Sequence, residues 1–394
     1  MRNLEENFSP LGAMQPSATL AISAKAKELK AKGADICSMT AGEPDFDTPQ
    51  AIKDACIKAI NEGKVRYLAA SGLPELKKEI VKKFAGNGIK TAPENIIVST
   101  GAKFALFQAI TTLCGAGDEV VLFAPYWLSY PEMIKASGAK VVEVVTHPEN
   151  NFEPIKADLE KAITSKTKLI ICNSPNNPTG AVYSLKTLQM IADIAVKNNI
   201  MVLSDEIYEK LVYNPQVKHI SIASLNPQIA DLTITVNGFS KAYAMTGWRL
   251  GYMCGNKEII DCIKSIRDYS IMGPTTFVQY GGIEAIRGSD KDIERMKLEF
   301  ERRRNYVVAR LNEMGLKCAK PKGAFYCFPN VYSTGLNGHD FSIRLIKEKQ
   351  VAVVPGTAFG ENSVYNIRIS YASRLEDLKE ALNRIEEFVN NLKR

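Results

Sequence analysis

Residues 232–252 read LTITVNGFSKAYAMTGWRLGY, a strand pattern that leads into a lysine in an unusual setting. The segment opens with apolar and β-branched residues, as in a strand that is buried on both faces of a sheet. Small residues then surround Lys241, and Arg249 follows eight positions later. A surface lysine needs no such surroundings, whereas a lysine that takes part in chemistry does. We therefore predict a functional site where this strand ends.

Four earlier segments show the same strand pattern, and helical patterns separate them. They are NIIVS (95–99), EVVLF (119–123), KLIIC (168–172) and IMVLS (200–204). Apolar strands that alternate with helices are typical of a mostly parallel sheet with helices on both faces. The sequence therefore predicts an α/β fold.

One of the helical patterns, TPQAIKDACIKAINEG (48–63), has recognisable ends. Thr48 is suited to the N-cap position and Pro49 to the first helical position. Gly63 is suited to end the helix. We therefore expect a helix from Pro49 to just before Gly63.

The sequence changes character from about residue 285. A long charged helical pattern, DKDIERMKLEFERRRNYVVARLNEM, comes first, and strand-like pieces and a final charged helix follow. We predict a large domain over 47–285 and a smaller α+β domain formed by 1–46 and 286–394. Within the long helix, the run ERRRN (301–305) is expected to be a solvated face.

The composition, with 394 residues of which 45% are hydrophobic and 24% charged, is that of an ordinary globular protein. No apolar run approaches the ~20 residues of a membrane span, and the first residues lack the apolar region of a signal peptide. We therefore expect a cytoplasmic protein without a membrane segment. The net charge of +7 is scattered. Nucleic-acid binding is not predicted, because no basic stripe with aromatic residues occurs; a mild positive excess suits anionic small molecules.

Cysteine and histidine residues give no indication of a metal site. None of the eight cysteines belongs to a C-x-x-C pair, and most lie in apolar surroundings. We interpret them as small buried hydrophobic residues in a reducing compartment. His147, His219 and His339 have no ligand spacing and are expected in loops or on the surface. No metal is therefore predicted, and the absence of a dinucleotide fingerprint argues against an oxidoreductase.

Residues with chemical uses follow all five predicted strands. The segments are GAKF, APYW, NSPNNPTG, DEIY and NGFSKAYAMTGWR, in chain order. Ligands of open parallel sheets bind beyond the carboxyl ends of the strands, so these segments are expected to meet at one site. Asp205, at a buried strand end, needs a cationic partner. Lys241 is one candidate, in a plain ion pair; alternatively, both residues face a bound cofactor.

The second alternative accounts for more of these residues. Arg249 suits a phosphate, and the helix that opens at Gly101–Lys103 offers free N–H groups as a second anion site. Trp127 offers a flat face to an aromatic ring, while Asn177 and Tyr208 offer polar groups to its substituents. A phosphorylated aromatic aldehyde bound to a lysine as a Schiff base uses all of these groups. Pyridoxal phosphate is such a molecule.

With these motifs in this order, the chain resembles the fold-type I pyridoxal-phosphate-dependent aminotransferases of class I/II. It is most similar to the bacterial aspartate aminotransferases of the aspartate/prephenate subgroup. The resemblance is carried by MQPSATLAI, TAGEPDFDTP, YLAASGLPELK, APYWLSYPEM, NSPNNPTGAVY, SDEIYE, SKAYAMTGWRLGY, KGAFYCF and VAVVPGTAFG with NIRISYA. It implies a seven-stranded, mostly parallel sheet between helices and a smaller α+β domain.

The resemblance also implies roles for single residues at the cofactor. Lys241 would bind the aldehyde, and Asp205 would keep the ring nitrogen protonated. Tyr208 and Asn177 would hold the phenolic oxygen, and Trp127 would stack on the ring. The phosphate would be held by Gly101, Ala102, Lys103, Ser240 and Arg249, and by Tyr67 of the neighbouring subunit in a homodimer with shared active sites. One departure is Gly238, where many relatives have a serine that contacts the phosphate.

The substrate is expected to be an amino acid with a second carboxylate. The resemblance implies that Arg368 clamps the α-carboxylate and that Gly42, Trp127 and Asn177 lie against the substrate. Lys103 is a cation in the first turn of a helix, where it is disfavoured by a few tenths of a kcal/mol. The cofactor phosphate or a side-chain carboxylate of the substrate would explain it. The resemblance associates this lysine with the side-chain carboxylate, with Thr19 nearby; a solvated lysine is the alternative.

We therefore predict an aspartate aminotransferase that uses 2-oxoglutarate and releases oxaloacetate and L-glutamate. A broad, aromatic, prephenate or kynurenine-type aminotransferase is the alternative. Elimination or decarboxylation on the same fold, and a non-enzymatic regulator, are less well supported.

Overall fold

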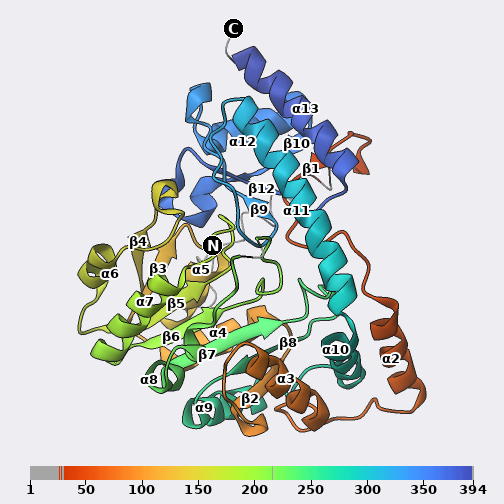
Figure 1. Cartoon of the computed structure of the whole chain (residues 1–394), viewed down its shortest axis with the longest axis vertical. Helices are drawn as coiled ribbons and strands as arrows, with labels where there is room; N and C mark the ends of the chain where they lie inside the picture. Colours follow the sequence, from red (N-terminus) through yellow and green to blue (C-terminus); the bar gives the residue numbers. More distant parts are fainter. Residues whose placement is uncertain (1–25, 27, 29–30, 215, 393–394) are drawn as a thin grey trace, which may run out of the picture.

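The computed structural model describes residues 26, 28, 31–214 and 216–392 (Figure 1). A seven-stranded sheet forms its centre. In spatial order its strands are β2 (Ile96–Ser99), β8 (Gly251–Cys254), β7 (Thr233–Gly238), β6 (Met201–Asp205), β5 (Thr167–Asn173), β3 (Glu119–Ala124) and β4 (Lys140–Val145). Thr19 lies outside the described residues.

The sheet confirms the five predicted strands as β2, β3, β5, β6 and β7. Strand β8 runs antiparallel to both of its neighbours, and the other strand pairs are parallel. All five predicted strands therefore point the same way, and their carboxyl ends lie at one edge. The sequence patterns missed β4 and β8. Strand β4 is a half-exposed edge strand, and β8 begins with a glycine and contains no β-branched residue.

Both faces of the sheet are covered by helices. In β3, Val120 and Leu122 pack on one face, while Val121 and Phe123 pack on the other. The first face is covered by α4 (Ala102–Leu113), α5 (Ser129–Ser137) and α9 (Lys257–Asp268). The second face is covered by α6 (Lys156–Ala162), α7 (Leu185–Asn198) and α8 (Pro227–Asp231). This explains why the strands are apolar on both sides.

Three helices pack around the β2–β8 end of the sheet, as the lower part of Figure 1 shows. They are α2 (Gln50–Asn61), α3 (Pro74–Gly86) and α10 (Thr276–Gly288). Gly63 ends α2 as predicted, because its N–H bonds to the Ile60 carbonyl with a φ of +73°. The prediction for Thr48 was wrong: Pro49 is the N-cap, and Thr48 donates to the Ala244 carbonyl instead.

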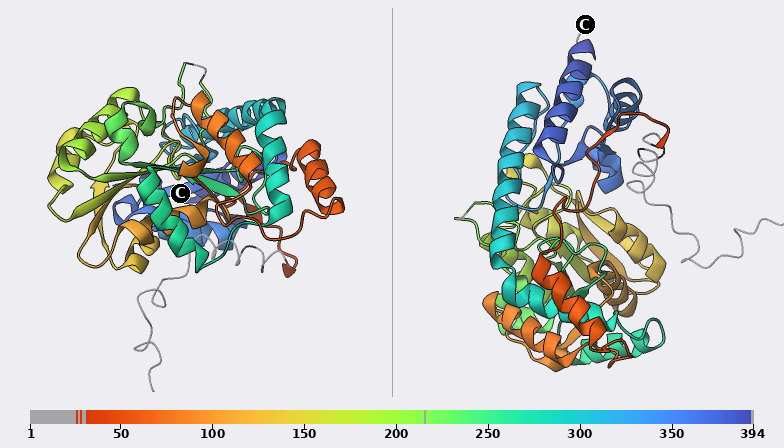
Figure 2. Two further views of the ribbon diagram at one scale, coloured as in Figure 1. Left: turned by 90° about the horizontal axis from the view of Figure 1, so that it is seen from below. Right: turned by 90° about the vertical axis from the view of Figure 1, so that its right-hand side faces the viewer.

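The remaining elements form a second layer around a small sheet. Strands β11 (Val354–Pro355), β12 (Ile367–Ser370) and β9 (Tyr326–Cys327) are antiparallel, and β1 (Cys37–Ser38) pairs in parallel with β10 (Val351–Ala352). They pack with α11 (Asp290–Glu313), α12 (Gly338–Lys349) and α13 (Leu375–Leu392), and Figure 2 shows α11 and α13 side by side. The short 3-10 helices are Pro93–Asn95, Pro148–Asn150, Ile222–Ser224, Tyr332–Thr334, Gly356–Phe359 and Glu361–Ser363.

Helix α11 confirms the predicted long helix, but the expectation of a solvated face at residues 301–305 was wrong for Arg303 and Arg304, whereas Arg302 and Asn305 are exposed. Arg303 is 5% exposed and forms an ion pair of 2.7 Å with Asp45. Arg304 is 4% exposed, and its Nη1 donates to the Pro321 carbonyl at 3.0 Å. Both guanidinium groups therefore fasten α11 to other segments of the chain.

The cysteine prediction was confirmed for six of the eight residues, which are buried free thiols; Cys37 is half-buried and Cys262 exposed. His147 and His339 are exposed, as expected, although His339 lies in α12. His219 also lies in a loop, as expected, but its side chain is not on the surface and is buried against Glu206. Within the described part of the chain, no helix combines the length and apolar character that a membrane span needs.

Candidate active site

A cavity of about 950 Å³ opens at the carboxyl ends of the central strands. The structure brings most of the predicted site residues together in its lining: Gly42, Ala102, Lys103, Trp127, Asn177, Asp205, Tyr208, Ser240, Lys241, Arg249 and Arg368. They come from segments that are more than 300 residues apart in the chain, as the positions of Gly42 and Arg368 show. The cavity therefore agrees with the prediction of one site at this edge of the sheet.

Lys241 lies in the turn that follows β7 and points into the cavity. Its Nζ donates a hydrogen bond to the Gly42 carbonyl. Burial lowers the pKa of Lys241 to about 8; the Glu43 carboxylate opposes this shift, whereas Arg368 and Arg249 add to it. A substantial fraction of the amine is therefore neutral near pH 8, as a nucleophile or proton acceptor requires.

Asp205 ends β6 and is 3% exposed. Its Oδ2 accepts a hydrogen bond of 2.7 Å from the Tyr130 hydroxyl, and its Oδ1 accepts one of 3.2 Å from the Ile207 N–H. Burial raises the pKa of Asp205 to about 6, although both hydrogen bonds oppose the shift. Since Lys241 bonds to Gly42, the plain ion pair between Asp205 and Lys241 is not formed. The carboxylate is thus available to a cationic group in the cavity.

The sequence patterns missed Tyr130 and Tyr326 as site residues. Tyr130 lies in α5, three residues after Trp127, and the two rings meet edge to face at 5.3 Å. The Tyr326 hydroxyl lies 3.1 Å from the hydroxyl of Tyr208. Both tyrosines stand in motifs that follow the pattern of the family, APYWLSYPEM and KGAFYCF, so a signal was present. Tyr208 is 3% exposed, and its ring lies beside the Lys241 amine, with 6.0 Å from Nζ to the ring centroid.

Arg368 is a buried cation in β12 without a carboxylate partner in the described part of the chain. Its Nη1 donates to Asn177 Oδ1 at 3.1 Å, and its Nη2 donates to the Thr40 carbonyl at 3.0 Å. The Nε atom is buried and has no partner. The guanidinium also stacks on the Tyr326 ring, with 4.5 Å to the centroid. An unpaired buried guanidinium is suited to a carboxylate ligand.

A second anion site lies where α4 begins. Gly101 is the N-cap residue with a φ of +83°, and a Cβ at this position would lie 2.5 Å from Arg249 Nη2. Glycine is therefore needed both for the backbone angle and for the approach of Arg249. The guanidinium is anchored by a bond of 2.9 Å from Nη1 to the Thr246 carbonyl. Together with the N–H groups of the first helical turn, it forms a suitable site for a phosphate.

The departure at Gly238 has a packing reason in this chain. A Cβ at Gly238 would lie 3.2 Å from the Cα of Gly251, in the neighbouring strand β8, and 3.2 Å from Ile207 Cδ1. A serine there would require these neighbours to move. Ser240, two residues further on, is buried and lines the cavity. A hydroxyl is thus still present next to Lys241.

Lys103 lies in the first turn of α4, with its Nζ 4.9 Å from the Trp127 ring centroid. Burial and the neighbouring Arg249 lower the pKa of Lys103. Its side chain lines the same cavity as Arg368. Lys103 and Arg368 are therefore two cationic positions of the cavity that lie outside the proposed Arg249 phosphate site.

Tyr67 does not lie in the cavity of its own chain. Its side chain is 87% exposed in the loop before α3. At this position the ring is accessible to a second subunit.

The residues of the cavity fit pyridoxal phosphate. The Lys241 amine is suited to the aldehyde, the Asp205 carboxylate to the ring nitrogen, and Arg249 with the start of α4 to the phosphate. When bound, this cofactor supplies an aromatic ring that accepts electrons from the α-carbon of an amino acid. The fold and the cavity thus fit an α/β enzyme that acts on amino acids with this cofactor.

The chain belongs to the aminotransferase class I and II family, which it matches over residues 34–385. It is accordingly an aminotransferase that depends on pyridoxal phosphate. This agrees with the resemblance inferred from the sequence motifs and confirms the predicted fold class.

The similar proteins align with nearly the whole length of the chain. Aspartate aminotransferase of Bacillus subtilis (strain 168) is 45% identical, over 96% of this chain and 98% of that protein. Aspartate/prephenate aminotransferase of Thermus thermophilus is 43% identical, over 94% and 96%. The solved structure of aspartate aminotransferase from Thermus thermophilus with maleate matches with a TM-score of 0.93 and 41% identity, over 98% of this chain and 100% of that one.

Proposed function

We propose that this aminotransferase transfers the amino group between L-aspartate and 2-oxoglutarate and releases oxaloacetate and L-glutamate. The observation that carries the proposal is the presence of Lys103 and Arg368 as two separate cations in one cavity. A substrate with two carboxylates satisfies both, whereas L-alanine satisfies only one. The names of the relatives and the dicarboxylate maleate in the similar structure support the same substrate class.

The geometry of the side chains supports the proposed roles. Arg368 binds the α-carboxylate and orients the substrate, with Gly42 and Asn177 beside it. The Lys241 amine, whose pKa is about 8 because of burial, takes the α-proton and later returns a proton. Asp205 keeps the ring nitrogen of the cofactor protonated. Trp127 and Tyr208 hold the ring and its phenolic oxygen.

The variant Lys103→Ser tests the substrate proposal. The kcat/KM for L-aspartate should fall about tenfold to a hundredfold, since hydrogen bonds to charged groups contribute ~1.5–3 kcal/mol. The values for L-alanine and L-phenylalanine should change much less. Lys140→Ser, at an exposed position of β4, is the matched control. Equal losses for all three amino acids would show that Lys103 does not bind the side-chain carboxylate.

Prephenate is the second candidate substrate, because a similar protein is named for both activities and the cavity of about 950 Å³ exceeds the size of aspartate. Prephenate also carries a second carboxylate. Lys103→Ser should therefore reduce activity toward prephenate together with that toward aspartate. Activity toward L-phenylalanine that exceeds both in the unaltered enzyme would favour an aromatic aminotransferase instead.

The active unit is proposed to be a homodimer in which Tyr67 contacts the cofactor phosphate of the partner subunit. Several large apolar side chains near Tyr67 and in the loop after α9 are exposed in the single chain: Val65 57%, Tyr67 87%, Tyr269 95%, Ile271 39% and Met272 55%. Exposed apolar groups of this kind mark protein interfaces. The eight free cysteines agree with a reducing compartment, and the cytoplasm is the proposed location.

A further inference from the structure

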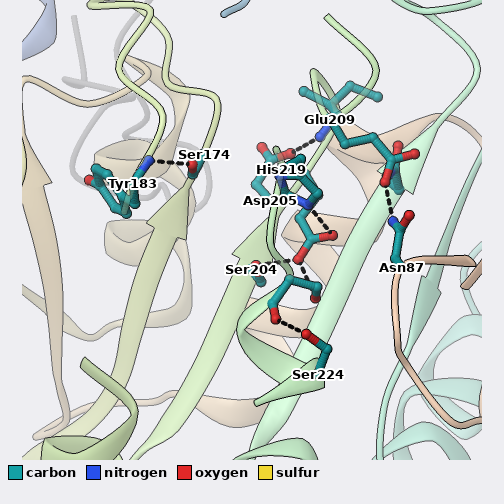
Figure 3. A network of polar contacts seen from close by, with 12 residues as sticks. Asn87, Ser174, Tyr183, Ser204, Asp205, Glu209, His219 and Ser224 are labelled. Atoms are coloured by element: carbon teal, nitrogen blue, oxygen red, sulfur yellow. Dashed lines mark hydrogen bonds and ion pairs between the residues drawn. The ribbon is translucent and has the colours of Figure 1, made fainter. Parts of the chain in front are cut away.

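A second group of buried charges lies directly behind Asp205, and Figure 3 shows part of it. Glu206 follows Asp205 in the chain and is 1% exposed. Because successive residues of an extended segment point to opposite sides, the Asp205 side chain faces the cavity and Glu206 faces away from it. The two carboxylates therefore share one short piece of backbone at the end of β6.

Glu206 is held by three side-chain donors. Its Oε1 accepts from Ser204 Oγ at 2.9 Å and from Ser221 Oγ at 2.6 Å. Its Oε2 lies 3.0 Å from His219 Nε2. The backbone of this segment is also anchored, since the Glu206 N–H donates to the Val236 carbonyl at 2.9 Å. The carboxylate thus ties the end of β6 to the segment 219–221.

A second ion pair stands beside the first. Glu209 lies 2.5 Å from Lys83 Nζ in α3 and accepts a hydrogen bond of 2.5 Å from Asn87 Nδ2. The side chains of Lys83 and Glu209 are 6% and 7% exposed. With His219 protonated, the group contains two negative and two positive charges. It is therefore electrically balanced although it is buried.

The charge balance of this buried group depends on whether His219 is protonated. Burial opposes the charged imidazole, but the carboxylates of Glu206 and Glu209 outweigh this, so the pKa of His219 is raised. Burial likewise opposes an ionised Glu206, but His219, Ser221 and Lys83 outweigh it and lower the pKa of Glu206. Ligand atoms of Glu206, Glu209 and His219 lie within 4.8 Å of one another. Since both carboxylates already have cationic partners, we interpret the group as two ion pairs.

We propose that Glu206 and His219 are positioning residues that hold Asp205 in place for the cofactor. This inference rests on the proposed role of Asp205. On the cavity side, Asp205 is held by the Tyr130 hydroxyl and the Ile207 N–H. On the other side, its backbone is fixed through Glu206. Without the imidazole, Glu206 becomes a buried carboxylate without a counter-charge and must take a proton or move toward water. Either response loosens the segment that carries Asp205.

One single variant and one double variant test this positioning role, and two further single variants serve as comparisons. His219→Gln should weaken binding of pyridoxal phosphate to the apoprotein about tenfold or more, because breaking a buried ion pair is strongly destabilising. It should also shift the pH at which the visible band of the bound cofactor titrates, and lower kcat with little change in KM for L-aspartate. The double variant Glu206→Gln with His219→Gln leaves no unpaired charge. It should recover most of the cofactor affinity.

Lys83→Met is the comparison variant, because it breaks the neighbouring buried pair with Glu209 and leaves the hydrogen bonds of Glu206 in place. It should lower thermal stability but weaken cofactor binding and shift the pH titration much less than His219→Gln does. If His219→Gln and Lys83→Met weaken cofactor binding equally, or if the double variant recovers nothing, the proposal is wrong. Asp205→Ala separates the two assumptions: if it leaves cofactor affinity unchanged, the role assigned to Asp205 fails first. If it weakens binding and His219→Gln does not, only the positioning proposal fails.

Discussion

Lys241 combines a half-buried amine with a pKa that burial lowers to about 8. Lys241→Ala should therefore abolish turnover, with a loss of at least about 10⁴, the upper range for a general acid–base group. The variant should still bind pyridoxal phosphate, since Arg249 and the start of α4 do not depend on the lysine. Steady-state assays and retention of the cofactor through dialysis check the two parts. Turnover near the level of the unaltered enzyme would contradict the assignment.

The same pKa predicts how the apoprotein reacts with its cofactor. Only the neutral amine attacks an aldehyde, so the rate of bond formation should rise with pH and level off above about 8, the pKa of Lys241. Stopped-flow absorbance over pH 6–10 measures this rate. A plateau near the ordinary lysine value of ~10.4 would show that the amine is not perturbed.

At the scale of single residues, the sequence predicted the site residues that follow the carboxyl ends of the strands. Lys241, Asp205 and Arg249 were found because parallel strands bring their carboxyl ends to one edge. Tyr130 was missed because it lies inside α5, and its bond to Asp205 depends on how α5 packs against α4 and β4. No local pattern describes that contact. The residues that were missed are thus those whose side chains contact the predicted site residues.

At the scale of elements, the ion pair between Glu206 and His219 gives the end of β6 a pH-dependent stability. The neighbouring carboxylates outweigh the effect of burial and raise the pKa of His219. Its contribution to the stability of the folded state is therefore complete below the unfolded pKa of ~6.5 and is lost as pH rises through the folded pKa. The pKa of Glu206 is lowered, so its contribution is present above the unfolded value of ~4.3 and is lost as pH falls through the folded value.

The unaltered apoprotein should therefore have a higher melting temperature than His219→Gln. This difference in melting temperature should become smaller as pH rises beyond neutrality. Differential scanning calorimetry between pH 6 and 9 provides the measurement. His147→Gln, at an exposed position, is the control variant. A constant difference across this range would mean that His219 does not titrate with folding.

Helix α11 offers a test at neighbouring positions. Arg303 is buried against Asp45, whereas the Arg302 side chain is 61% exposed. Arg303→Ala should destabilise the fold by about 3 kcal/mol, because it leaves Asp45 without its partner. Arg302→Ala should change stability by less than about 0.5 kcal/mol. Urea unfolding of both variants decides; similar values would contradict the structural role of Arg303.

The long helix was predicted, but the burial of its arginines was not. The pattern ERRRN is polar, and polar runs in helices are usually solvated. Asp45 and Phe46, which contact Arg303, come from a segment more than 250 residues away. A charged side chain can be recognised as buried only when its distant partner is known. The distant residues that a helix contacts therefore cannot be predicted from the sequence pattern of the helix alone.

At the scale of the whole molecule, a shared active site can be tested by mixing two inactive variants. In a dimer of one Lys241→Ala chain and one Tyr67→Ala chain, one of the two sites has both residues intact. Random reassociation of equal amounts should therefore restore about a quarter of the activity. Light scattering gives the oligomeric state in parallel. No gain on mixing would show that Tyr67 does not act across the interface.

The pairing of β1 with β10 joins Cys37 to Val351, and Ser38 to Ala352. A ribosome adds ~5–20 residues per second, so on the order of tens of seconds separate the synthesis of these two strands. The central sheet, which ends at Cys254, can assemble during this interval. The segment before α2 must wait, with its strand edge unsatisfied. Newly made chains should therefore depend on chaperones that bind the segment before α2. The cavity should form only after the last third of the chain has been made.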